Sequence, residues 1–180
     1  MDNTPISALI IAFGVVIAAV VAAWIILRNR RSANLRQHFG TEYDRTVEAT
    51  GSRARAEADL LSRAERVKRL GIHPLAPGDR DRFAARWRTT QASFVDNPTN
   101  AVAEASALVE EIMRARGYPV ADFERRAADI SVDHPKFVEN YREARAIALS
   151  AQRGTAKTED LRRATIHYRD LFEDLLETAA

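Results

Sequence analysis

The hydropathy pattern begins with an unbroken apolar run from Ile6 to Leu27. Ser7 is its only polar side chain, and no charged residue interrupts it. A helix of this length rises about 33 Å, while the hydrocarbon core of a bilayer is about 30 Å thick. The run is therefore predicted to be a transmembrane helix that contacts membrane lipid, preceded by a short tail over residues 1–5.

Basic residues follow the apolar run, and none precedes it. Arg28, Arg30 and Arg31 form a basic membrane flank over residues 28–32. Trp24 lies one turn before this flank, where an indole ring would sit at the level of the lipid headgroups. The positive-inside rule then places the N-terminal tail outside and the remainder in the cytoplasm. We expect a single-pass protein of the cell membrane.

Small residues repeat within the run at Gly14, Ala18 and Ala22. This spacing puts them on one helical face and permits close approach of a second helix in lipid, which would give a homo-oligomer. The alternative, that glycine and alanine are simply common in such spans, stays open. A cleaved signal peptide is disfavoured, because the tail carries Asp2 and no basic residue.

After residue 32 the apolar positions recur every three or four residues, which is typical of amphipathic helices. The clearest stripes occupy the fourth and last of seven expected helices. The expected helices cover about 33–49, 53–70, 79–95, 99–116, 120–130, 135–151 and 158–176. The two clearest stripes are Val102, Ala105, Val109, Ile112 and Met113, and then Leu161, Ala164, Tyr168, Leu171, Phe172 and Leu175.

Glycine and proline divide this helical part. The segment 71–78, GIHPLAPG, holds two prolines and two glycines and is predicted to be a linker. Residues 33–70 before it would form a membrane-proximal hairpin or stalk, and residues 79–180 after it a C-terminal helical bundle. The predicted fold class is all-α: an N-terminal transmembrane helix followed by a soluble multi-helix bundle.

Composition narrows the candidate chemistry. The chain has no cysteine, which excludes disulfides, thiolate metal sites and a cysteine nucleophile. Its formal net charge of +2 equals the sum over Asp2, Arg28, Arg30 and Arg31, so the rest of the chain is balanced. The basic residues of the second soluble helix alternate with acidic ones, which favours a solvated face. We therefore expect no nucleic-acid partner.

Few side chains suggest a reaction. Asp133 and His134 form the weak candidate site, with Asp129 and Glu139 nearby in sequence. They could make a metal or acid–base site, or Asp133 could simply cap a helix that begins at Pro135. The chain contains no Glu-x-x-His and no Gly-x-Ser-x-Gly. No catalytic, cofactor-binding or metal-binding residue is predicted, and no cofactor.

Aromatic residues concentrate in one helix, at Phe83, Trp87 and Phe94. This stripe is read as core, with an exposed docking surface as the alternative.

Three segments carry a resemblance to a family: FGTEYDRTV at 39–47, GYPVADFERRAADISVDHPKFVENYREARAIA at 117–148, and TEDLRRATIHYRDLFEDLL at 158–176. They resemble an uncharacterised group of bacterial single-pass membrane proteins. The resemblance implies a bacterial origin and no assigned activity. The anchor and the missing catalytic pattern together predict a non-enzymatic module that binds or scaffolds another protein at the membrane. The alternatives are an enzyme with a dispersed site near His134 and a purely structural membrane protein.

Overall fold

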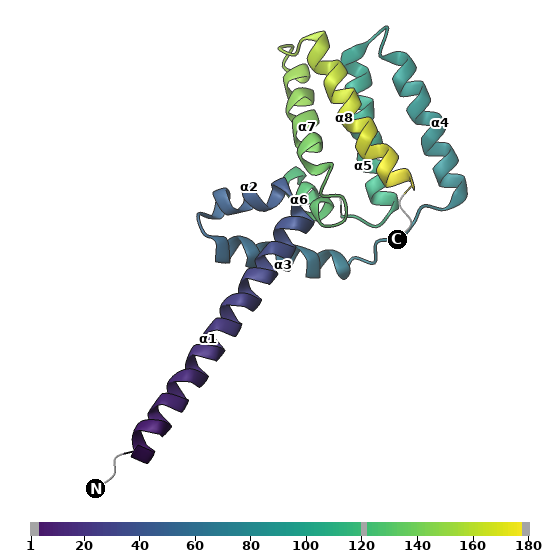
Figure 1. The fold of residues 1–180 in the computed structure, drawn as a ribbon. Coiled ribbons are helices and arrows are strands. Elements are labelled where there is room, and N and C mark those ends of the chain that lie inside the picture. The colour runs from purple at the N-terminus through teal and green to yellow at the C-terminus, as the bar shows by residue number, and fades with distance from the viewer. Residues whose placement is uncertain (1–3, 120–121, 178–180) are drawn as a thin grey trace. The chain divides into compact units, whose positions relative to one another are not determined.

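The computed structural model describes the backbone of residues 4–119 and 122–177, and the side chains of residue 14, residues 16–119 and residues 122–177. This part of the chain forms eight α-helices and no strand, which confirms the all-α prediction (Figure 1). The helices are α1 (Thr4–Phe39), α2 (Thr41–Thr50), α3 (Arg53–Lys68), α4 (Pro77–Ser93), α5 (Pro98–Ala115), α6 (Phe123–Asp133), α7 (Val138–Gln152) and α8 (Thr158–Glu177).

The chain divides into two compact units, Met1–His38 and Phe39–Ala180. In the first unit, α1 continues without interruption through the predicted span and its basic flank. Among the side chains that the structure describes, no helix is both long and apolar enough to cross a membrane. Residues 6–13 and 15 of the predicted span lie outside those side chains.

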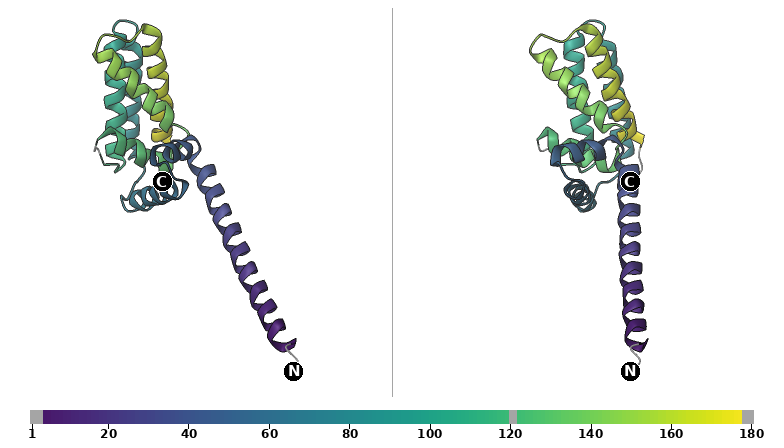
Figure 2. Two further views of the ribbon diagram at one scale, coloured as in Figure 1. Left: turned by 90° about the vertical axis from the view of Figure 1, so that its left-hand side faces the viewer. Right: turned by 60° about the vertical axis from the view of Figure 1, so that its left-hand side comes forward.

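The second unit is built on four long helices, α4, α5, α7 and α8, which lie side by side (Figures 1 and 2). Helices α5 and α8 contact each other, and each of them also contacts α4 and α7. Ser106 meets Tyr168, and Arg116 meets Leu175, so α5 and α8 run in the same direction. Short loops return α4 into α5 and α7 into α8, as the predicted bundle requires.

The predicted apolar stripes form the core of this bundle. Every member of the α5 and α8 stripes is buried. Trp87 stacks on Phe172 with ring centroids 4.7 Å apart, and Phe83 is also buried. These two aromatic residues of α4 are therefore core, as predicted, while Phe94 at the end of the stripe is only partly buried.

The first expected soluble helix is divided at Gly40. Its backbone has φ 52° and ψ −127°, a conformation that glycine adopts far more readily than any residue with a Cβ atom. Helix α1 therefore ends at Phe39, and α2 begins as a separate helix. The expectation of one continuous helix over about 33–49 was therefore wrong.

Helices α2 and α3 lie against each other as a hairpin. The hairpin belongs to the second unit, where α3 contacts α6 and α2 contacts α7 (Figure 2). A non-helical segment follows α3, and α4 begins at Pro77. Proline suits this first helical position because its missing N–H would have no partner there.

Candidate functional site

The described part of α1 exposes a continuous series of large apolar side chains. They are Val16, Ile17, Val20, Val21, Trp24, Ile25, Ile26 and Leu27. Soluble proteins rarely expose a patch of this kind, because each such side chain gains roughly 1.5–3 kcal/mol on full burial. This surface is therefore suited to an apolar environment such as lipid or a second helix.

The predicted membrane flank continues this surface. The Arg28 guanidinium lies 5.3 Å from the centroid of the Trp24 ring, a cation–π contact between the predicted interface anchor and the first basic residue. Arg30 and Arg31 are exposed. So are Gly14, Ala18 and Ala22, and a Cβ atom on Gly14 would meet nothing within 4 Å. The small face is thus open to a neighbouring helix.

Asp133 and His134 lie at the end of α6, where their side chains have different partners. Asp133 is the last residue of α6 and accepts a 2.6 Å hydrogen bond from the Tyr118 hydroxyl. Burial, and then this bond, raise the pKa of Tyr118 above its usual range. His134 is buried, and its Nδ1 contacts Asp174 Oδ2 of α8. Its Nε2 is buried without a hydrogen-bond partner among the described residues.

The expected capping role of Asp133 is not found. Helix α7 begins at Val138, and Phe137 occupies the capping position, because residues 134–137 form a turn closed by Phe137 N–H and His134 C=O. Glu139 is exposed in the first turn of α7. No group of three metal-ligating side chains occurs in the part of the chain that the structure describes.

The carboxylate of Asp129 in α6 contacts the α2–α3 hairpin. It is 1% exposed, and its Oδ1 accepts bonds from Arg66 Nε at 2.9 Å and Nη2 at 2.6 Å. A buried carboxylate needs such a cation, because desolvation otherwise penalises its charge. The solvated face expected for the basic residues of this helix is therefore wrong at Arg66, whose partner lies 63 residues away in the sequence.

A second set of ion pairs joins the hairpin to α6 and α7. Glu42 of α2 is 1% exposed, and its Oε1 accepts from Arg63 Nη1 at 2.8 Å and Arg142 Nη2 at 3.1 Å. Arg142 also pairs with Glu124, and Arg63 with Asp59. We call these five side chains the Glu42 network. Together with the Arg66–Asp129 pair, it fastens the hairpin to the rest of the second unit.

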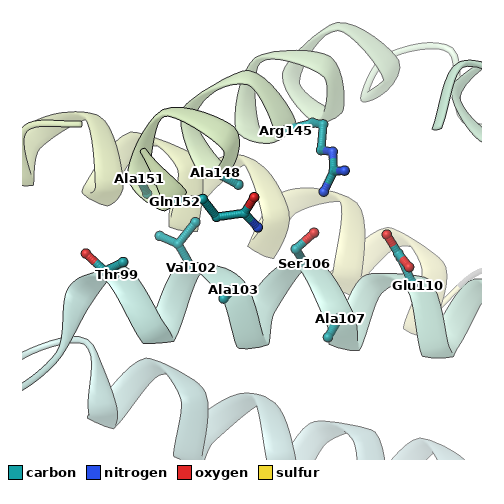
Figure 3. A pocket seen from close by; sticks show the side chains of 10 residues that line it. All are labelled: Thr99, Val102, Ala103, Ser106, Ala107, Glu110, Arg145, Ala148, Ala151 and Gln152. Carbon is teal, nitrogen blue, oxygen red and sulfur yellow. The ribbon is translucent and has the colours of Figure 1, made fainter. Parts of the chain in front are cut away.

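A cleft of about 190 Å³ opens between α5 and α7 (Figure 3). Its walls carry short side chains, Ala103 and Ala107 from α5 and Ala148 and Ala151 from α7. Ser106, Glu110 and Arg145 provide polar groups at one end, and Thr99 and Gln152 at the other. None of these residues was predicted to form a site, because small and polar positions beside a core stripe give no distinct sequence pattern.

The remaining histidines do not gather into one site. His167 Nε2 lies 3.2 Å from Glu143 Oε2, and His73 Nδ1 lies 3.2 Å from its neighbour's carbonyl, Pro74 O. His38 is exposed near the end of α1.

Comparison of the chain with protein-family models, with curated proteins and with solved structures gives no match.

Proposed function

We propose that this chain is a single-pass membrane protein whose helical unit binds or scaffolds another protein beside the membrane, without catalysing a reaction. One observation carries the proposal: the exposed apolar series from Val16 to Leu27, on a helix that continues into the flank Arg28, Arg30 and Arg31. Lipid removes the cost of exposing that series, and each flanking arginine near an anionic leaflet contributes about 1 kcal/mol. The bacterial origin implied by the resemblance is part of the same proposal.

The flank also supports an orientation. All of its charges follow the apolar series, so the positive-inside rule places the helical unit in the cytoplasm.

The region around His134 supports binding over catalysis. The His134 side chain is 1% exposed and contacts Asp174, while Asp133 and Asp129 each bind a different partner. A general base must come within hydrogen-bond reach of the proton that it removes. A substrate has no such access to the ring, and these side chains instead hold α6 against its neighbours.

Topology is tested with single cysteines, since the chain has none of its own. Lys157→Cys lies in the exposed α7–α8 loop, and Asn3→Cys marks the N-terminal tail. With a membrane-impermeant thiol reagent on intact bacterial cells, we expect labelling at position 3 and none at position 157 until lysis. Labelling of position 157 in intact cells would reverse the orientation. Release of the chain by alkaline carbonate would overturn the anchor.

Partner binding is tested with a photo-crosslinking amino acid at position 95. Val95 is 86% exposed, the highest value among the large apolar side chains that the structure describes. We expect a crosslink to a second protein from this position and none from the exposed polar position Arg153. Crosslinks only to another copy of the chain would favour a purely structural oligomer. Turnover of a substrate by the purified chain, abolished by His134→Ala without loss of stability, would favour an enzyme.

A further inference from the structure

The cleft between α5 and α7 contains a cation, Arg145, that forms no salt bridge with a carboxylate among the described residues. Arg145 of α7 lines the cleft, and Figure 3 shows its guanidinium pointing from α7 towards α5, where Ser106 and Glu110 lie. Its contact within the chain is with the Phe123 ring, at 5.7 Å from the centroid. No salt bridge joins Arg145 to any acidic residue that the structure describes.

The other described arginines of intermediate exposure pair with carboxylates, and the fully buried Arg116 donates to the Leu175 carbonyl. Arg66 pairs with Asp129 and Arg142 with Glu42. Glu110, the carboxylate that lines the same cleft, is already bound by Arg126 Nη2 at 2.7 Å. The charge of Glu110 is therefore balanced from outside the cleft, and the charge of Arg145 remains available to a ligand.

A buried hydroxyl lies at the same end of the cleft. Ser106 is 9% exposed, and its Oγ accepts a 3.1 Å hydrogen bond from the Tyr168 hydroxyl. In this pair the Tyr168 hydroxyl is the donor and the Ser106 oxygen the acceptor. The Ser106 hydroxyl then has its own proton free to donate to a further acceptor.

Between its two polar ends the cleft is apolar and small. Alanines from both helices form its sides, and its volume of about 190 Å³ is below the roughly 300 Å³ at which pockets for drug-sized ligands begin. A ligand that fits must be short, with an anionic group at one end and an apolar body.

We propose that this cleft binds a small organic carboxylate. The carboxylate accepts from the Arg145 guanidinium and the Ser106 hydroxyl, and the apolar body lies between the alanines. Charge-assisted bonds of this kind are about twice as strong as neutral ones, and they would select an acid over its amide. The site is independent of the membrane anchor, so it stands or falls separately from the proposed function.

The test uses the full chain in a neutral detergent, observed by backbone amide NMR during titration with benzoate and hexanoate. Benzamide and hexanamide serve as uncharged controls. We expect saturable shifts at Ser106, Ala107 and Arg145 for at least one acid at up to about 10 mM, where a ligand with a Kd of 1 mM would nearly saturate its site. Neither amide should cause them. The proposal is overturned if neither acid shifts these residues, or if acid and amide act alike.

Variants test whether the ligand binds in the cleft or at another surface of the protein. Arg145→Gln should weaken binding at least tenfold, and Ala107→Leu, at an exposed position of the cleft wall, should block it. Arg88→Gln removes an exposed arginine of α4, outside the cleft, and should leave the affinity unchanged. Should Arg145→Gln fail to fold, Ala107→Leu and Ser106→Ala still decide the matter. Unchanged affinity in both of these would contradict the proposal.

Discussion

The guanidinium of Arg116 donates a 2.8 Å hydrogen bond to the backbone carbonyl of Leu175, across the parallel pair α5 and α8. Arg116 is 1% exposed and directly follows the last residue of α5. Leu175 lies in the last turn of α8, where carbonyls lack partners within the helix. One buried side chain thus satisfies the end of a helix that is distant in sequence, and its positive charge suits the negative end of the helix dipole.

Two substitutions of Arg116 should destabilise the bundle to different extents. Arg116→Ala removes the bond and the packing of the aliphatic stem, and should lower the free energy of unfolding by about 2–4 kcal/mol. Arg116→Met keeps most of the stem and should cost about 1–2 kcal/mol. Urea unfolding followed by circular dichroism measures both, with exposed Arg114→Met as the control. A methionine variant as stable as the wild type would show that burying the charge costs as much as the bond contributes.

The Arg66–Asp129 pair should behave as a coupled unit. Arg66→Gln leaves a buried carboxylate without its cation, and should lower the free energy of unfolding by about 2–4 kcal/mol. Adding Asp129→Asn should recover part of that loss, since the second change removes the stranded charge. A double-mutant cycle from chemical denaturation gives the coupling energy. Exposed Arg55→Gln, on the same helix, should change little, and strictly additive losses would show that the two residues act independently.

Gly40 and Gly78 provide a matched pair of substitutions. Neither position has an atom within 4 Å of where a Cβ would lie, so any difference comes from the backbone. Gly40→Ala forces a side chain into φ 52° and should cost about 1–3 kcal/mol. Gly78→Ala lies in the first turn of α4 and should stabilise by about 0.4–1 kcal/mol. Thermal unfolding measures both, and equal effects would argue against strain at Gly40.

Alkaline pH should destabilise the helical unit through its buried tyrosines. Burial raises the pKa of Tyr118, Tyr141 and Tyr168, in the last case to about 12. The unfolded chain releases these protons near pH 10 while the folded chain retains them, so the free energy of unfolding should fall as pH rises from about 10 to 12. The contribution is fully present below about pH 10.

Tyr168→Phe isolates one of these contributions. The change keeps the ring but removes the phenol hydroxyl, so the loss of stability between about pH 10 and 12 should become smaller by about 2 kcal/mol. Denaturant unfolding at several pH values measures the slope for variant and wild type. An unchanged slope would show that folding does not raise the pKa of Tyr168.

The features that could be predicted from the sequence are those that depend on the spacing of apolar residues within one helix. The stripes from Val102 to Met113 and from Leu161 to Leu175 are buried because helical spacing alone puts each set on one face. This spacing does not indicate which helices pack against one another. The parallel course of α5 and α8 and the position of the hairpin therefore appear only in the structure.

The partners of the buried polar side chains could not be predicted either, because they lie far away in the sequence. Glu42 lies one residue before the buried Tyr43, and no residue near it in the sequence indicates that it is buried against Arg142. Asp133 and His134 were noticed because they are adjacent in sequence, yet in space they bind Tyr118 and Asp174. The unpaired charge of Arg145 can be recognised only when the partners of the other arginines are known.

The Glu42 network also affects the order in which the contacts of the second unit can form during synthesis. Glu42 precedes its partner Arg142 by 100 residues. At roughly 5–20 residues per second, a ribosome needs about 5–20 s to cover that distance. Arg63 is made early in that interval and Asp129 only near its end, so the α2–α3 hairpin can form well before its contacts with α6 and α7.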